Sequence, residues 1–503
     1  MLSLLPDSGG PTLHALAGLP SDAALADLGA LLVLLPVDGQ PGRLPEAARW
    51  RELHARLPAR HGDVRATTLA QASPCVAALG YCRADASAFE VLSVAGKLVR
   101  QALALHPQIR RLGILVPTGT PGRRRAWQEA LFAAASAQAF TLPNAKASTP
   151  GSPAPARLTR VDLFGSADVD LRRSQATAKA GNLVRHLTAL PPNVLDAGGY
   201  RRALATLARR HGLTLRWYSE AALEKLGAGA FLAVSRGNPS RDAGIAHLSY
   251  RPKGRRTKQP DVSLVGKGIL FDTGGTNLKP HRSMLDMHTD MAGSAVALAS
   301  IVALSEMKAP LAVDAWLAIT ENNIGPKAYR PQEVIRAANG TTIQVIHSDA
   351  EGRMVLADTL TLAARTKPGL IVDYATLTGA CVHALTERLS GVFSNRDAYA
   401  PVLTAAGAAS GERVWPFPLD EDFDSDIDSS TADVAQCAVE GKGDHILAAR
   451  FLKRFVPDTT PWVHVDLSSA TRRGGLAHVA TEITGFGVRF TLSLLLDQKL
   501  PTP

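Results

Sequence analysis

The stretch VGKGILFDTGG, residues 265–275, is the part of this sequence that most directly indicates the fold. An apolar run typical of a buried strand leads straight into a glycine-rich segment, with Lys267 and Asp272 close to that junction. In α/β proteins, functional sites lie in the loops at strand ends, and glycines let such loops approach a ligand closely. We therefore predict a strand that ends at a site, with an ordinary glycine turn as the alternative.

The sequence on both sides of this stretch alternates between apolar runs and helically spaced apolar residues. It predicts an α/β domain over residues 174–503, with a central mixed sheet flanked by helices. This region contains all the chemistry that the sequence reveals. The predicted strands are residues 262–265, 312–319, 369–374 and 462–465, and the predicted helices are residues 176–190, 294–305 and 354–364.

The first 165 residues have a different character, and we expect them to form a smaller α/β domain with a largely parallel sheet. Residues 144–157, NAKASTPGSPAPAR, are typical of a loop and are a candidate hairpin tip. The predicted strands here are residues 29–36 and 112–117, and the predicted helices are residues 86–105 and 125–139.

The chain has 503 residues and a formal net charge of +10, which raises nucleic acid as a partner. Its basic residues occur in short, scattered groups, at residues 123–125 and 253–258, without interleaved aromatic residues. This distribution favours a solvated arginine-rich surface. Nucleic-acid binding stays as an alternative function, alone or in addition to catalysis.

The four cysteines, Cys75, Cys82, Cys381 and Cys437, form no CxxC pair, so neither a zinc knuckle nor a disulfide framework is indicated. The N-terminus lacks the basic region of a signal peptide, and no apolar run reaches the roughly 18 residues needed to span a bilayer. We expect a soluble cytoplasmic protein without a membrane partner.

Four carboxylates lie on three segments of the larger domain: Asp272, Asp290, Asp349 and Glu351. If the fold brings them together, they repel one another strongly unless cations lie between them. Two divalent ions sharing these carboxylates would polarise a substrate carbonyl and lower the pKa of a bridging water. The pattern therefore predicts metal-assisted hydrolysis.

Each acidic segment also has a plainer interpretation. Asp290 precedes a helical run of small residues, where an N-cap acid is common. Asp349, Glu351 and Arg353 could form a salt-bridged turn, although the apolar sequence on both sides indicates burial. A metal-dependent phosphoesterase is a further alternative, because carboxylate pairs also serve phosphoryl transfer.

Several motifs resemble the leucyl aminopeptidase (cytosol aminopeptidase) family, the M17 metallopeptidases. HSDAEGR, residues 347–353, differs from that family's NTDAEGR only at its first two positions. The resemblance covers most of residues 175–495, and it implies a macro-like N-terminal domain before the catalytic one. Other similar segments are VGKGILFDTGG followed by Lys279-Pro280, MHTDMAG (287–293), PPN (191–193), GAFLAVSRGN (229–238), AYRP (328–331), ATLTGA (375–380) and TGFGVR (484–489).

This resemblance implies a site with two divalent metals, zinc or manganese first and magnesium or cobalt as further candidates. One metal would be held by Asp272, Glu351 and Asp349, the last through both its side chain and its backbone carbonyl. The other would be held by Asp272, Asp290, Glu351 and Lys267. A lysine ligand must be a neutral amine, so its pKa would have to be depressed.

The resemblance also assigns catalytic and substrate-binding roles. Lys279 would stabilise the oxyanion, and Arg353 would hold a bicarbonate ion as general base. The free α-amine of a peptide would bind the second metal, which explains exopeptidase specificity. The residues implied in substrate binding are Met287, Thr376, Leu377 and Gly379.

Three departures from the family pattern put details of the site in question. The loop ENNIGPKAYRP (321–331) is altered, and the glycine-rich stretch within residues 433–452 is weak. DLSSATRR (466–473) places Ser468 and Thr471 where apolar pocket residues are expected, so a leucine preference does not follow. The resemblance implies a homohexamer, but the sequence alone identifies neither the assembly nor the physiological metal.

Overall fold

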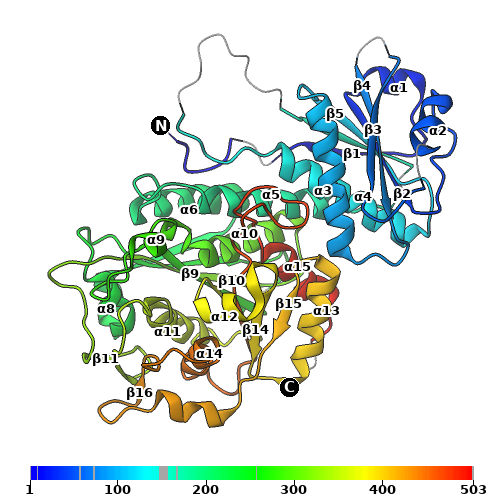
Figure 1. Cartoon of the computed structure of the whole chain (residues 1–503). Coiled ribbons are helices and arrows are strands. Elements are labelled where there is room, and N and C mark those ends of the chain that lie inside the picture. The colour runs from blue at the N-terminus through cyan, green and yellow to red at the C-terminus, as the bar shows by residue number, and fades with distance from the viewer. Residues whose placement is uncertain are drawn as a thin grey trace.

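The computed structural model describes residues 2–7, 10–55, 58–71, 74–146, 157–165, 168–255 and 258–500. It contains two main β-sheets with helices on both faces of each, and the α/β class is confirmed (Figure 1). The domain boundary at residues 165–174 stays a prediction, although β6 ends at Phe164 and α5 begins at Leu171.

Within the described residues, the N-terminal sheet has six strands in the order β1-β6-β5-β2-β4-β3, all parallel except the edge strand β3. Helices α3 and α4 cover one face, and α1 and α2 cover the other. The elements are β1 (Thr12–Leu16), α1 (Asp22–Ala26), β2 (Ala30–Pro36), α2 (Ala47–Ala55), β3 (Val64–Leu69), β4 (Cys75–Cys82), α3 (Ala88–Leu105), β5 (Arg111–Leu115), α4 (Pro121–Ala139) and β6 (Arg160–Phe164).

The predicted hairpin around residues 144–157 is wrong. Residues 140–146 form no strand, and the following strand β6 lies between β1 and β5, parallel to both. A hairpin would have required an antiparallel partner from the preceding segment. Residues 147–156, most of the proposed tip, lie outside the described part of the chain.

The larger sheet is mixed, as predicted, with eight strands in the order β15-β14-β17-β13-β9-β10-β8-β7. Its central strands β17, β13, β9 and β10 are parallel to one another. A three-stranded sheet, β11-β12-β16, lies apart from it. The strands are β7 (Thr214–Ser219), β8 (Gly244–Tyr250), β9 (Val262–Asp272), β10 (Val313–Asn322), β11 (Val334–Arg336), β12 (Thr342–Gln344), β13 (Leu370–Ala375), β14 (Ser390–Ser394), β15 (Val414–Pro416), β16 (Val434–Ala435) and β17 (Trp462–Asp466).

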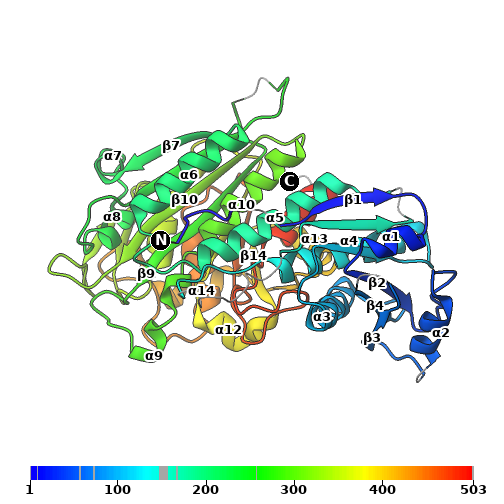
Figure 2. The same cartoon turned by 90° about the horizontal axis from the view of Figure 1, so that it is seen from above.

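Helices pack on both faces of this sheet and produce two hydrophobic cores. One core involves α5, α6, α10, α13 and α15, and the other involves α7, α8, α11 and α14 (Figures 1 and 2). The helices are α5 (Leu171–Thr188), α6 (Ala197–His211), α7 (Glu220–Lys225), α8 (Gly229–Ser235), α9 (His281–Met284), η1 (Met287–Thr289), α10 (Ala292–Met307), α11 (Glu351–Ala364), α12 (Gly379–Leu385), η2 (Thr386–Arg388), η3 (Asp397–Tyr399), α13 (Ala400–Ser410), η4 (Glu421–Ile427), α14 (Asp444–Lys453) and α15 (Val488–Asp497).

Strand β9 extends to Asp272, so two of the glycines expected in a loop lie inside the strand. A Cβ atom on Gly266 would lie 2.5 Å from the Cα atom of Ser294 in α10, and one on Gly293 would lie 2.1 Å from the carbonyl oxygen of Tyr374. These glycines allow α10 to pack directly against the sheet. Only Gly274 and Gly275, with φ of 84° and 64°, form the turn that follows β9.

The helical run His281–Met307 is long and apolar enough to cross a membrane by composition, and 83% of its most apolar window is buried. Most of the run is α10, which packs between β9 and α5. This burial is what the core helix of a soluble protein shows.

Candidate metal centre

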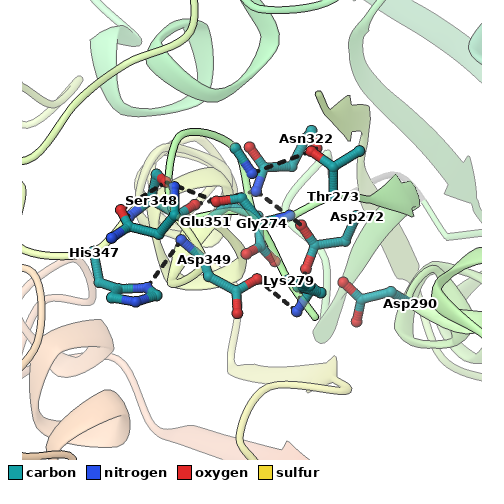
Figure 3. A network of polar contacts seen from close by, with 12 residues as sticks. Asp272, Thr273, Gly274, Lys279, Asp290, Asn322, His347, Ser348, Asp349 and Glu351 are labelled. Carbon is teal, nitrogen blue, oxygen red and sulfur yellow. Dashed lines mark hydrogen bonds and ion pairs between the residues drawn. The ribbon is translucent and has the colours of Figure 1, made fainter. Parts of the chain in front are cut away.

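Three of the four predicted acids converge where the parallel strands of the larger sheet end. Asp272 is the last residue of β9, Asp290 directly follows η1, and Glu351 is the first residue of α11. All three are buried, and each offers a carboxylate oxygen within 4.8 Å of those of the other two. Figure 3 shows these acids, from separate segments, pointing toward one another.

The charge within this cluster is unbalanced. Burial raises the pKa of Asp290 to about 6 and that of Glu351 to about 7, and the charge of Asp272 adds to both shifts. One carboxylate oxygen of Glu351, Oε2, is buried without a hydrogen-bond partner among the residues that the structure describes. Oxygen-rich donors with an unsatisfied lone pair fit a divalent cation, so the residues present are suited to holding metal.

Asp349 lies at the rim of the cluster instead of inside it. Its side chain is 25% exposed, against 2% for those of Asp272 and Glu351. Lys279 joins the rim to the cluster, because its Nζ lies 2.5 Å from Asp349 Oδ1 and 2.9 Å from Asp272 Oδ2 (Figure 3). Burial also raises the pKa of Asp349, to about 7.

Lys267 lies in the middle of β9 with its ammonium group inside the cluster. Its Nζ is 2.8 Å from Asp290 Oδ2 and 2.9 Å from Glu351 Oε1, and it donates to the Thr376 carbonyl oxygen at 2.9 Å. Burial alone would lower its pKa, but the carboxylates outweigh burial and raise it. For Lys267 to act as a neutral ligand, bound cations would have to displace its proton.

Gly352 provides the space for this lysine. A Cβ atom at position 352 would lie 2.7 Å from Lys267 Cε and 2.8 Å from Lys267 Nζ. The glycine of the HSDAEGR motif therefore has a packing role at the first turn of α11.

Two polar residues that the sequence did not single out as site residues support the cluster. Asn322 pairs with Asp272 in the β9–β10 register and donates to its Oδ1 at 2.8 Å and to the Ser348 carbonyl oxygen at 3.1 Å. Asp466, the last residue of β17, accepts from the Thr378 hydroxyl at 2.6 Å and from the Leu377 backbone N–H at 3.1 Å. In the sequence, the signal that could have identified these two residues is their position shortly after the end of a predicted strand.

The predicted substrate-binding residues lie near the cluster but differ in what they contact. The Thr376 hydroxyl donates to Asp290 Oδ1 at 2.6 Å, so it positions an acid of the cluster. The Leu377 backbone N–H already donates to Asp466 Oδ1, at 3.1 Å. Gly379 begins α12, and Met287 begins η1, which leads to Asp290.

Arg353 is buried in α11, two residues after Glu351, and it contacts a residue that the sequence did not flag. Its Nη2 donates to Asp444 Oδ1 at 2.8 Å and to Asp444 Oδ2 at 2.7 Å, and its Nη1 donates to the Gln436 carbonyl oxygen at 3.2 Å. Asp444 begins α14, in the stretch where the family's glycine-rich pattern is weak. An acid of the chain therefore occupies this face of Arg353.

A cavity of about 470 Å³, the usual size of a small-ligand site, opens beside these residues. Its lining includes the acid at the rim of the cluster, both residues predicted to be catalytic, and two of the predicted substrate-binding residues. Among the lining residues are Lys279, Asp349, Arg353, Leu377, Gly379 and Asp444.

Ser468, at a position expected to border the specificity pocket, is buried and donates to Cys381 Sγ at 3.0 Å. Thr471 forms an isolated β-bridge with Ile483. The Ser468 hydroxyl therefore already has a hydrogen-bond partner inside the protein.

Comparisons with known proteins identify relatives of this chain. The sequence profile described as "Cytosol aminopeptidase family, catalytic domain" matches residues 182–492. A probable cytosol aminopeptidase of Synechococcus sp. (strain CC9605) is 39% identical over 348 residues, covering 68% of this chain and 70% of the relative. One of Acidovorax sp. (strain JS42) is 37% identical over 432 residues, covering 84% and 82%.

A similar solved structure is that of "Bottromycin maturation enzyme BotP in complex with Mn". It superposes with a TM-score of 0.77 at 30% sequence identity, and the match covers 93% of this chain and 99% of that one. The likeness therefore extends over both sheets.

Proposed function

The chain belongs to the cytosol aminopeptidase family and is a metallo-exopeptidase; from that membership we propose a two-metal mechanism for removing the N-terminal residue of peptides. The observation that carries the proposal is the buried cluster of Asp272, Asp290 and Glu351, whose oxygens lie within 4.8 Å of one another. The residues proposed to hold the metals are Lys267, Asp272, Asp290, Asp349 and Glu351.

When bound, the two ions would polarise the scissile carbonyl and activate a water molecule at neutral pH. Manganese and zinc are the first candidates, with magnesium and cobalt also compatible with oxygen-rich ligands. The similar solved structure is a complex with manganese, which supports manganese here.

Lys279 is proposed to stabilise the oxyanion that forms at the carbonyl. Its ammonium group lines the cavity, and Asp272 and Asp349 hold it in place and raise its pKa although burial opposes them. It therefore stays charged at neutral pH and can donate a hydrogen bond where negative charge develops.

Arg353 is proposed to hold the anion that accepts a proton from the attacking water and passes it to the leaving amine. Bicarbonate is the anion that the family resemblance implies. Any carboxylate held in the same place meets the same chemical need, since one oxygen accepts the proton while the others stay bonded to the guanidinium.

Peptides are the substrates that the family implies, and a free N-terminus, a cytoplasmic location and a homohexamer are part of the proposal. Light scattering of the purified protein tests the hexamer. The nucleic-acid and phosphoesterase alternatives gain no support from the relatives, and in one of the two basic groups Arg255 is paired with Asp261. Arg256 of that group lies outside the described residues.

A panel of aminoacyl coumarin amides, assayed with each metal and with a chelator, tests the proposed activity. We expect hydrolysis of substrates with a free α-amine, loss of activity on chelation and recovery when metal is returned. N-acetylated versions of the same substrates are the matched control and should stay intact. Metal-loaded protein that cleaves no free-amine substrate would contradict the proposal.

A further inference from the structure

Arg353 carries a buried positive charge that needs an anion, and Asp444 provides it. The arginine is 2% exposed, and both carboxylate oxygens of Asp444 accept from its Nη2 atom, at 2.8 and 2.7 Å. An unpaired guanidinium at this depth would be costly, whereas a charge-assisted pair with two short hydrogen bonds is stable. The position that a small anion would take on this side of Arg353 is therefore filled from within the chain.

The backbone before Asp444 is built to bring this side chain to the cavity. Gly441 and Gly443 have φ of 67° and 62°, and Val439 is 88% exposed, so residues 439–443 cross the surface before α14 begins. Asp444 is in the first turn of α14, where the helix dipole favours a carboxylate. Its side chain keeps 24% of its surface exposed, against 3% for that of Arg353.

Asp444 lines the same cavity as residues of the proposed reaction centre. Lys279, Asp349 and Arg353 line that cavity together with Asp444. Asp444 as proton acceptor and the oxyanion-stabilising ammonium group of Lys279 would therefore both contact the same bound peptide.

We propose that Asp444 is the anion that Arg353 holds during catalysis, so that this enzyme needs no bicarbonate. The inference rests on the proposed aminopeptidase function. As the water oxygen bonds to the carbonyl carbon, one water O–H bond breaks and its proton passes to an Asp444 oxygen. The same proton then moves to the leaving nitrogen as the C–N bond breaks, which returns Asp444 to the carboxylate form. Peptide and water are thereby converted to an amino acid and a shortened peptide.

The test compares the metal-loaded full-length enzyme and Asp444→Ala in buffer depleted of carbon dioxide and in the same buffer with sodium bicarbonate. We expect the wild-type rate to be unchanged by bicarbonate. In Asp444→Ala, kcat should fall by roughly 100-fold or more, with metal content retained, because a general base is lost. Bicarbonate, formate or acetate should then restore part of kcat, which a merely structural residue would not allow.

Asp424→Ala is the matched control, because Asp424 forms a similar two-bond pair with Arg450 of the same helix α14. It should show no rescue by anions. Asp444→Asn keeps the shape of the side chain; it should lose activity and resist rescue, since the amide still fills the anion position. If Asp444→Ala does not fold, the activity of Asp444→Asn and the response of the wild type to bicarbonate still test the proposal.

Binding of ¹³C-bicarbonate, followed by NMR, gives a readout separate from turnover: Asp444→Ala should bind it and the wild type should not. Stimulation of the wild type by bicarbonate, full activity of Asp444→Ala without added anion, or failure of that variant both to bind bicarbonate and to be rescued would overturn the inference. A wild type that hydrolyses no substrate contradicts the proposed function, and the NMR comparison then still tests the anion position.

Discussion

At the scale of single residues, the site consists of four carboxylates whose negative charge is only partly offset by two lysines. Lys267 forms ion pairs with Asp290 and Glu351 inside the cluster, and Lys279 bridges Asp272 and Asp349 at its rim. Their positions differ in burial, with side-chain exposures of 4% and 14%. The inner lysine is therefore suited to a ligand role and the outer one to contact with substrate.

Replacing Lys279 by alanine should lower kcat by about 100- to 1,000-fold, because one preorganised donor to the oxyanion is lost. Metal content, measured by elemental analysis of the purified protein, should be unchanged. Arg282→Ala, at a neighbouring exposed cation, should keep the wild-type rate. Loss of metal from Lys279→Ala would mean that its proposed role is wrong.

Replacing Asp290 by alanine should remove one of the two metal ions, because Asp290 is proposed to coordinate only one of them. Elemental analysis after dialysis should find one ion per chain instead of two. Asp286→Ala removes an exposed acid from the same segment and should leave both ions bound. Two retained ions in Asp290→Ala would contradict the ligand assignment.

At the scale of elements, close packing of α10 and α11 on the sheet determines where the acids lie. Glycines at the contacts, Gly266 and Gly293 for α10 and Gly352 for α11, remove the side chains that would hold the helices away. Asp290 lies just before the start of α10, and Glu351 is the first residue of α11, so a shift of either helix would move the acids of the cluster apart.

Gly293→Ala should destabilise the protein by about 1–3 kcal/mol, the usual cost of overpacking a core. The added Cβ atom would lie 2.1 Å from a backbone oxygen of β13 that cannot move away. Urea unfolding of metal-free protein measures the effect. Gly181→Ala, in α5 with open space at the new Cβ atom, should instead be neutral or stabilising by up to about 1 kcal/mol. Equal effects of the two variants would refute this packing argument.

At the scale of the whole molecule, Asp358 joins segments that are far apart in sequence. This fully buried carboxyl of α11 accepts from the Phe231 N–H of α8 at 2.8 Å and from the Ala338 N–H at 2.7 Å. Burial raises its pKa to about 7, with those hydrogen bonds opposing the shift. Its protonation is therefore linked to global stability.

Asp358 should make the folded state less stable as pH rises from about 4 to about 7. In that range the folded protein keeps a proton on Asp358 that the unfolded chain has released, so its contribution is complete below the unfolded pKa and lost as pH passes the folded one. The difference in unfolding free energy between wild type and Asp358→Asn should shrink with pH, by at most about 1.4 kcal/mol per pH unit. Urea titrations across this range measure it, and a difference that stays constant with pH would contradict the raised pKa.

The sequence by itself determined the α/β class, the mixed sheet, the main strands and helices, and the acids that are proposed to hold the metals. Apolar periodicity is local and survives in any fold, and the HSDAEGR motif was long enough to indicate the family. The apolar pattern did not determine every helix boundary, because α5 begins at Leu171, where Asp170 caps it, before the apolar pattern starts.

Only the tertiary structure decided which residues meet. Gly266 lies inside a strand, and Asp349 lies at the rim of the acidic cluster. The Thr376 hydroxyl donates a hydrogen bond to Asp290, and Arg353 pairs with Asp444, 91 residues later in the chain. These outcomes depend on strand register and helix packing between distant segments. The local pattern of residues does not determine strand register or helix packing, because the free energy that selects both comes from contacts made only when the chain is folded.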